Sequence, residues 1–200
     1  DVVRPAIQTI GLQKDVNIVA GLYILMTKRG PLFLSDTSIN IDPSSKDLAK
    51  IAQMTSKVIK MFGMQPVMAM ISFSNFGSSR FIQAKKVTEA VSILHRSNPK
   101  LVVDGPIQSD FALNPEMLKA KFPFSKLAGK KVNTLIFPDL ASSNIAYKLL
   151  AELGNAEAIG PILLGMNKPV HVLQLGSSIR EIVNMVAIAV VDAQSSKSSL

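Results

Sequence analysis

The chain has 200 residues, no cysteine, 48% hydrophobic residues and a formal net charge of +8. This length suits one domain, or one large and one partial domain, and the lack of cysteine excludes disulfides, thiolate zinc sites and cysteine nucleophiles. The positive charge favours an anionic ligand such as a nucleotide, CoA or nucleic acid, although lysines on a solvated surface would explain it equally well.

The first half of the chain alternates apolar runs with helical spacing. We expect the end of a helix over residues 1–10, then buried strands over residues 19–27 and 32–34. Asp42, Pro43 and Ser44 are typical of a helix start, and Gly63 of the end of that helix. A further apolar strand is expected over residues 67–72.

The second half continues the alternation. It predicts helices over about 82–95, 115–121, 143–153 and 179–193, and strands over 101–103, 135–137 and 162–164. The Ser/Lys-rich residues 195–200 are expected to form a flexible tail. Strands that alternate with helices in this way predict an α/β fold with a largely parallel sheet, whose ligands bind beyond the carboxyl ends of the strands.

Small polar loops follow several of these strands. In residues 74–80, a glycine, several serines and Arg80 could bind a phosphate, or the segment could be an ordinary strand-to-helix turn. Asp104 and Asp139 each stand at an expected strand end, where a carboxylate can act as a base or simply cap a helix. Taken singly, each aspartate is better explained by the second role.

Other features favour structural explanations. Ser178 to Glu181 have the pattern of a capping box ahead of a helix. His95 and His171 lack partners at metal-ligand spacing, so no metal site is expected in this chain. Residues 182–191 are apolar but too short to cross a membrane, and scattered basic residues with only 6% aromatics argue against a nucleic-acid partner.

Four longer segments resemble the phosphate acetyl/butyryltransferase (phosphotransacetylase) family in order and spacing. They read SFSNFGSS, VDGPIQSDFALNP, LIFPDLASSNIAYK and AEAIGPILLGMNKPV, and together they span most of the chain. The resemblance implies a three-layer αβα, phosphotransacetylase-like fold, as in isocitrate and isopropylmalate dehydrogenases, with two subdomains and a cleft between them. It also implies acetyl transfer between CoA and phosphate, which uses a carboxylate base, a Ser-Arg pair and further arginines.

Several catalytic positions of that family carry different side chains here. Aligned on the Lys-Pro-Val segment, the family's serine falls on Gln174, its arginine on Leu175 and its base aspartate on Glu181. A second family arginine falls on Glu152, whereas another is retained as Arg4. Leucine cannot bind phosphate and Glu152 would repel it, so the resemblance implies a region without catalytic residues of its own.

A subset of that family is more similar still. The segments VAGLYILMTKRGPLF, SDTSINIDP, KPVHVLQLG and IVNMVAIAVVDAQ resemble the C-terminal region of large bacterial NADP-dependent malic enzymes. This implies that residues 1–194 form one transferase-like domain of a longer, cytoplasmic chain, followed by the tail at 195–200. Upstream domains would convert malate to pyruvate with NADP and Mg or Mn, while this region binds acetyl-CoA as an effector and forms a homodimer or higher homo-oligomer.

The resemblance and the loop positions together give candidate residues for binding the acyl-CoA: Arg4, Ser74, Gly77, Ser78, Asp139, Asn144, Lys168 and His171. Two alternatives remain open. One is an active phosphate acetyltransferase, which makes acetyl phosphate and CoA from acetyl-CoA and phosphate. The other is a structural module that oligomerises and retains only the remnant of a cleft. Neither a membrane nor a nucleic acid is expected as a partner.

Overall fold

The computed structural model describes residues 3–173 and 175–197. In chain order the elements are α1 (Val3–Ile10), β1 (Ala20–Thr27), β2 (Gly30–Ser35), α2 (Ser45–Met61), β3 (Val67–Ile71), α3 (Ile82–Ser97), β4 (Val102–Ile107), α4 (Ser109–Ala112), α5 (Pro115–Lys121), β5 (Thr134–Ile136), α6 (Leu140–Gly154), β6 (Glu157–Leu164) and α7 (Ile179–Lys197). The predicted alternation of strands and helices is therefore present.

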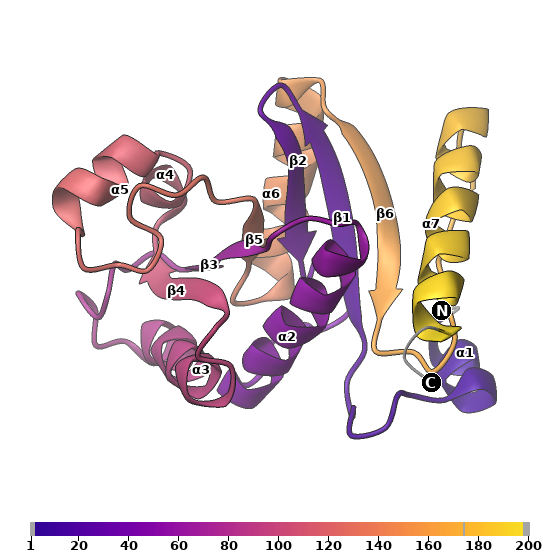
Figure 1. Cartoon of the computed structure of the whole chain (residues 1–200), viewed down its shortest axis with the longest axis horizontal. Coiled ribbons are helices and arrows are strands. Elements are labelled where there is room, and N and C mark those ends of the chain that lie inside the picture. The colour runs from indigo at the N-terminus through magenta and orange to yellow at the C-terminus, as the bar shows by residue number, and fades with distance from the viewer. Residues whose placement is uncertain (1–2, 174, 198–200) are drawn as a thin grey trace.

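The strands form one six-stranded sheet in the order β4-β3-β5-β2-β1-β6 (Figure 1). Strands β4, β3, β5 and β2 pair in parallel, as predicted. Strand β1 runs antiparallel to both of its neighbours, β2 and β6. The β1–β2 pairing is a hairpin whose tip lies at the amino end of β2, so five of the six carboxyl ends share one edge of the sheet.

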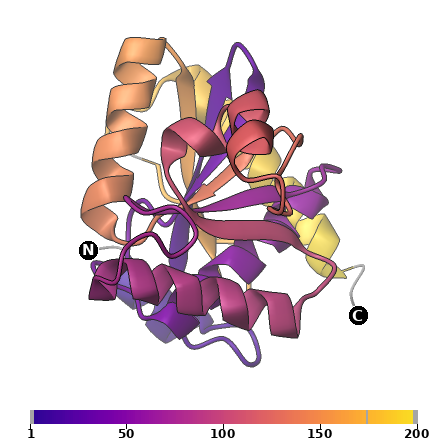
Figure 2. The same ribbon diagram turned by 90° about the vertical axis from the view of Figure 1, so that its left-hand side faces the viewer.

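Helices cover both faces of the sheet, which confirms the three-layer αβα architecture (Figure 2). On one face α2, α3 and α7 bury side chains such as Ile51, Val87 and Met185 in a common core. On the other face α4, α5 and α6 contribute Ala112, Leu118 and Tyr147 to a second core. Burial of these apolar side chains on both faces is the main force that holds the layers together.

Local signals set the ends of α2 as predicted. The Ser44 hydroxyl accepts a hydrogen bond from the Asp47 N–H at 3.2 Å, and the Asp47 carboxylate accepts one from the Ser44 N–H at 3.1 Å. This capping box satisfies two N–H groups that the first turn of a helix leaves unpaired. Gly63 follows the helix at a φ of 71°, which a residue without a side chain adopts without strain.

Three strands are longer than predicted, and each contains a Gly-Pro pair. Strand β2 begins at Gly30 rather than at residue 32, and its Pro31 precedes the residues that pair with β5. The prediction ended the 101–103 strand before Gly105, but β4 continues to Ile107, and β6 begins at Glu157 rather than at residue 162. Because β4 and β6 are the two edge strands, each has a neighbour on one side only, and a proline nitrogen can face the open side without removing a ladder hydrogen bond. Sequence analysis took these Gly-Pro pairs as strand breaks, whereas in the structure they lie within strands.

Two helices also extend beyond the predicted limits. Helix α6 begins at Leu140 rather than at residue 143, and α7 continues through Lys197 instead of ending near residue 193. Residues 195–197 thus belong to α7, since serine and lysine disfavour a helix only slightly, while the flexibility of the 195–200 segment stays a prediction. Residues 198–200 lie outside the described part of the chain.

Candidate functional site

The loops after β3 and β4 meet at the carboxyl edge of the sheet, as the parallel topology predicts. The Asn75 side-chain amide donates to Gln108 Oε1 at 2.6 Å, and the Gln108 N–H donates to Asn75 Oδ1 at 2.8 Å. Gln108 also donates from its side chain to the Phe73 carbonyl at 3.0 Å. These paired amides hold two loops together that are more than thirty residues apart in the sequence.

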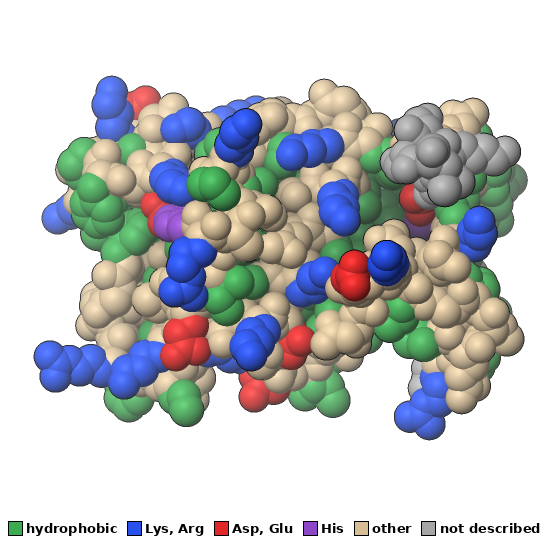
Figure 3. Space-filling model, turned by 60° about the horizontal axis from the view of Figure 1, so that its bottom comes forward, with side chains coloured by type: hydrophobic (Ala, Val, Ile, Leu, Met, Phe, Trp, Pro, Cys, Tyr) green, Lys and Arg blue, Asp and Glu red, His purple; other side chains and the backbone are tan. Residues whose placement is uncertain are grey.

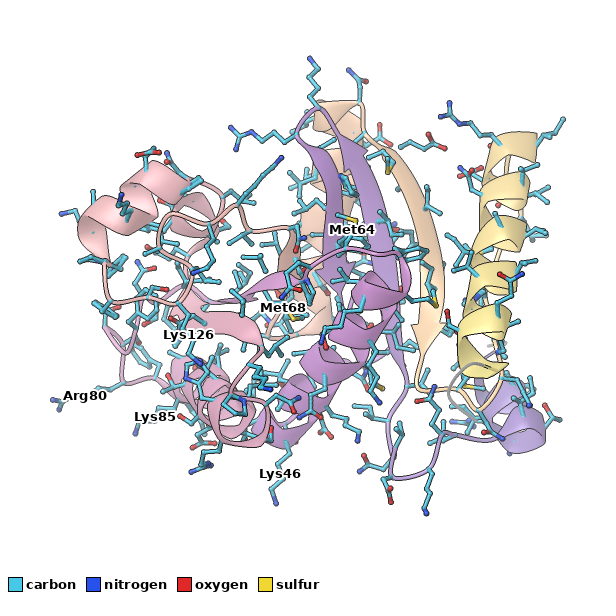
Figure 4. The ribbon with its side chains drawn as sticks, in the orientation of Figure 1. Lys46, Met64, Met68, Arg80, Lys85 and Lys126 are labelled. Carbon is cyan, nitrogen blue, oxygen red and sulfur yellow. The ribbon has the colours of Figure 1, made fainter. Side chains whose placement is uncertain are left out.

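The serines of the loop after β3 bind one another. The Ser74 and Ser78 hydroxyl oxygens lie 3.0 Å apart, and Ser74 also accepts from the Ser79 N–H at 3.1 Å. Gly77 supplies the left-handed backbone of the turn at a φ of 85°. Ser74, Ser78 and Gly77 thus lie together where they were predicted, but the hydroxyls are engaged within the loop, and Arg80 points outward (Figure 4).

Asp139 and Asn144 belong to α6 and its cap. The Asp139 carboxylate accepts from the Ser142 N–H at 2.8 Å, so it is the N-cap of the helix. Asn144 donates to the Thr37 carbonyl at 3.3 Å and so ties α6 to the loop after β2. Both residues lie at the predicted edge of the sheet, and each has a complete structural role there.

Sequence analysis missed the residue that organises the loop after β2. Asp36 is 3% exposed, and its carboxylate accepts from the N–H groups of Gly21, Ser38, Ile39 and Asn40 at 2.8 to 3.2 Å, and from the Asn40 side chain at 2.5 Å. A carboxylate that accepts so many N–H groups fixes the backbone around it. The available signal was an aspartate at a strand end followed by Thr-Ser, a pattern typical of a side chain that turns back onto its own backbone.

The other candidate residues are separated from one another. Arg4 on α1 is exposed and lines a shallow depression of about 340 Å³ together with Ser38 and Ile39. Lys168 is exposed in the segment after β6. The side chain of His171 is only 2% exposed, with Nε2 at 3.4 Å from an Asp192 carboxylate oxygen of α7. His171 is thus enclosed between the segment after β6 and α7, and contact with a ligand would require this segment to move.

A cavity of about 440 Å³ brings together three of the four positions at which sequence analysis predicted a departure from the resembling family. We call it the β1–α6 cavity, and it is lined by Glu152 of α6, Leu175, Glu181 of α7, and residues of β1 and β6. Gln174, the fourth such position, lies outside the described residues. None of the eight candidate ligand residues lines this cavity, so the structure separates the two sets that the sequence suggested.

Aromatic side chains and a glycine shape the wall of the β1–α6 cavity. The rings of Tyr23 and Tyr147 stack with centroids 4.4 Å apart and an interplanar angle of 17°. Gly160 of β6 also lines the cavity, and a Cβ there would lie 2.8 Å from the Leu22 carbonyl oxygen and 2.9 Å from Tyr23 Cδ1. Only glycine therefore allows β6 to approach β1 closely enough at this point.

The charged lining of the β1–α6 cavity is two carboxylates and one ammonium. Lys148 Nζ lies 5.8 Å from the centroid of the Tyr147 ring. Glu181 accepts from the Ser178 N–H at 2.5 Å while Ser178 Oγ accepts from the Glu181 N–H at 3.2 Å, so the predicted capping box is confirmed. The hydrogen bonds from the Ser178 backbone and side chain lower the pKa of Glu181 from its ordinary value of 4.5. An ionised carboxylate with a lowered pKa is a weak base, because its charged form is already stabilised.

The described residues offer neither a candidate metal site nor a candidate membrane span. Within residues 3–173 and 175–197, no three His, Asp or Glu residues lie close enough together to hold a metal ion. No helix in that part of the chain is long and apolar enough to cross a membrane. Lys and Arg are dispersed over one face with hydrophobic and acidic side chains between them (Figure 3).

Asp104, within β4, accepts from Ser125 Oγ and the Lys126 N–H at 2.8 Å and so has a structural role.

Comparison with known proteins identifies relatives of this chain. Residues 1–190 match the family described as phosphate acetyl/butaryl transferase. The chain is 43% identical over 185 residues to the NADP-dependent malic enzyme of Haemophilus influenzae, which covers 92% of this chain and 24% of that enzyme. It is 39% identical over 193 residues to the phosphate acetyltransferase of Bacillus subtilis, which covers 96% of this chain and 59% of that protein.

The fold agrees with solved structures. A phosphotransacetylase from Streptococcus pyogenes superposes with a TM-score of 0.91 at 40% identity, over 96% of this chain and 59% of that one. The EutD phosphotransacetylase from Staphylococcus aureus superposes with a TM-score of 0.90 at 36% identity and the same coverage. The chain thus spans about a quarter of the malic enzyme and nearly 60% of these transferases.

Proposed function

The chain belongs to the phosphate acetyl/butaryl transferase family, and we propose that it is a regulatory region that binds acetyl-CoA in an NADP-dependent malic enzyme without transferring the acetyl group. The observation that carries this proposal is the lining of the β1–α6 cavity by Glu152, Leu175 and Glu181. These side chains lie together in space although they are up to 29 positions apart in the sequence.

Acetyl transfer to phosphate requires more positive charge than the one ammonium group, that of Lys148, in the described lining of this cavity. The reaction joins an anionic phosphate to a thioester carbonyl whose oxygen becomes negative in the transition state, so hydrogen-bond donors and cations must surround it. Loss of one such donor typically lowers kcat by about 10²–10³. Here two carboxylates outnumber the single ammonium of Lys148, a leucine stands at an arginine position of the resembling family, and Glu181 is a weak base, so we expect no measurable transfer.

The same cavity retains properties that suit a thioester ligand. Its volume of about 440 Å³ falls within the roughly 300–1,000 Å³ of small-molecule sites, which are mostly apolar and aromatic. The stacked Tyr23 and Tyr147 rings give it an apolar wall against which an acetyl-pantetheine end can pack. The net charge of +8 would attract the phosphates of CoA toward the surface around the cavity.

The link to a malic enzyme rests on the relative from Haemophilus influenzae. Because this chain corresponds to only 24% of that enzyme, we assign NADP and Mg or Mn to its other domains. Acetyl-CoA would then act as an effector, which requires unequal affinity for two states of the enzyme. Assembly into a homodimer or higher homo-oligomer belongs to the same proposal.

The test combines binding and turnover on the full-length protein. We expect isothermal titration to detect acetyl-CoA binding while an acetyl phosphate–CoA assay detects no transfer. The triple variant Gln174→Ser, Leu175→Arg and Glu152→Arg should gain transfer activity. The matched control is Leu153→Arg, because Leu153 is 83% exposed on the same helix and does not line the cavity. Absence of binding would overturn the proposal.

A specific observation favours a second candidate, an active phosphate acetyltransferase. Glu181 keeps a carboxylate in the cavity, and the chain is 39% identical to the phosphate acetyltransferase of Bacillus subtilis. If Glu181 were the base, the unaltered protein would form acetyl phosphate and Glu181→Gln would abolish this activity. Such a result would replace the regulatory proposal with the enzymatic one.

A further inference from the structure

A second cavity, larger than the β1–α6 cavity, lies between the β1–β2 hairpin and the turn from α4 to α5. Its volume is about 800 Å³, and we call it the hairpin cavity. It is lined by residues 27–32 of the hairpin, Met64, residues 113–115, residues 131–133 ahead of β5, and Leu150 of α6. Figure 4 labels Met64 beside the hairpin.

The hairpin cavity is independent of the site discussed so far. The hairpin tip and residues 131–133 lie at the amino ends of β2 and β5, opposite the edge that carries Ser74 and Asp139. The hairpin and β1–α6 cavities share no lining residue. A ligand in the hairpin cavity would therefore bind without displacing acetyl-CoA from the proposed site.

Positive charge gathers at the hairpin cavity without a carboxylate to balance it. Lys28, Arg29 and Lys131 line it, and none of its lining residues is acidic. Arg29 Nη1 donates to the Leu113 carbonyl at 3.1 Å across the cavity, and Lys131 donates to the carbonyl of Arg29. Within the described residues, the ion pairs involve none of these three cations. Backbone carbonyls thus fix the side chains of Arg29 and Lys131 at the cavity, and a bound anion would supply the negative charge that the lining lacks.

The remaining wall of the hairpin cavity is mostly apolar, with Thr27, Asn114 and Asn133 as its polar members. Leu32 and Val132 are buried beneath it, and Pro31, Met64 and Leu113 complete the surface. An inorganic anion would use only the cationic rim, and a neutral hydrocarbon only the apolar wall. A ligand that uses both has a negative head and an apolar body.

We propose that the hairpin cavity binds a small organic carboxylate with an alkyl body, its carboxylate at Arg29 and Lys131 and its chain against Leu32, Met64 and Val132. The guanidinium of Arg29 bridges the two walls through Leu113, so it is oriented before the ligand arrives. Charge-assisted hydrogen bonds from an oriented guanidinium are stronger than those between neutral groups.

Octanoate is the probe. Its binding to the full chain is measured by isothermal titration and by the NMR shifts of backbone amides. We expect saturable binding, with amide shifts confined to residues 27–30, 32, 64, 113–114, 131–133 and 150. The double variant Arg29→Gln and Lys131→Met should weaken binding about tenfold or more. Lys57→Met is the matched control, since Lys57 is an exposed lysine of α2 that does not line the cavity, and it should leave binding unchanged.

Control ligands test the cationic rim and the apolar wall of the hairpin cavity separately. Octylammonium should not bind because the cations repel it, and 1-octanol and acetate should each bind more weakly than octanoate. Leu150→Trp, a change at a partly exposed position of the lining, should fill the cavity and abolish binding. The proposal is wrong if octanoate does not saturate up to about 10 mM. It is also wrong if octylammonium binds equally well, or if the double variant binds octanoate as the parent does.

Discussion

Asp36 offers the sharpest test of how the loop after β2 is held. Its buried carboxylate accepts five N–H groups, four from the backbone and one from the Asn40 side chain. The loop it organises includes Thr37, whose carbonyl receives Asn144 of α6. Replacing Asp36 by alanine would leave all five donors without their acceptor.

The expected loss of stability can be estimated from those contacts. The Gly21 N–H is buried, and a buried donor without a partner costs about 1–3 kcal/mol. The other four donors are partly reached by water, and a hydrogen bond to a charged group contributes about 1.5–3 kcal/mol net, of which water would replace much. We therefore expect Asp36→Ala to lower the free energy of unfolding by about 4 kcal/mol. Asp36→Asn, which keeps one acceptor oxygen, should lower it by about 2 kcal/mol.

Urea unfolding followed by circular dichroism measures this difference. With an m-value of about 2 kcal/mol/M, the alanine variant should unfold about 2 M earlier than the parent. Asp42→Asn is the control, because the Asp42 side chain is 78% exposed and its ion pair with Lys86 should contribute less than about 1 kcal/mol. An Asp36→Ala variant within about 1 kcal/mol of the parent would refute the reasoning.

Three further predictions concern the capping box at Ser178, the contact between β3 and β4 at Gly105, and the wall of the β1–α6 cavity. Because Ser178 lowers the pKa of Glu181, its carboxylate stabilises the fold above its unfolded pKa, and this contribution is lost as pH falls through the folded pKa. Glu181→Gln should therefore be less stable than the parent at pH 7 and equal to it in acid; a difference that persists in acid would contradict this. Gly105→Ala would place a Cβ 2.6 Å from the Met70 carbonyl oxygen at a φ of +147°, and should cost about 3 kcal/mol in urea unfolding, whereas a loss below about 1 kcal/mol would exclude the clash. Tyr147→Ala removes a buried stacked ring and should cost about 3 kcal/mol and weaken acetyl-CoA binding; unchanged affinity would separate this ring from the ligand site.

Much of the fold could be predicted because its signals are local. Apolar runs of strand length, helical spacing and the capping boxes at Ser44 and Ser178 depend on residues a few positions apart. Sequence analysis predicted the edge strands β4 and β6 too short, because a Gly-Pro pair normally breaks a strand. Whether a proline is tolerated depends on having no neighbour on one side, and that is decided by the order of strands in the sheet.

The candidate site was predictable only in part for a similar reason. The loop serines, Asp139 and Asn144 lie at the expected edge, because parallel strands place their carboxyl ends together. What those polar groups bind was not predictable, since the Ser74–Ser78 contact and the Asp139 cap satisfy them within the fold. The roles of the eight candidate residues as ligand contacts remain predictions.

The sequence by itself determined the α/β class and the type of every described element except the short α4, because each is encoded in a local pattern. Its resemblance to a family singled out Glu152, Leu175 and Glu181. Only the tertiary structure decided that these three side chains share one cavity, that His171 is enclosed beside Asp192, and that β1 runs against the other strands. Such features depend on contacts between segments far apart along the chain. The free energy of those contacts comes from burial and pairing that exist only once the layers have packed.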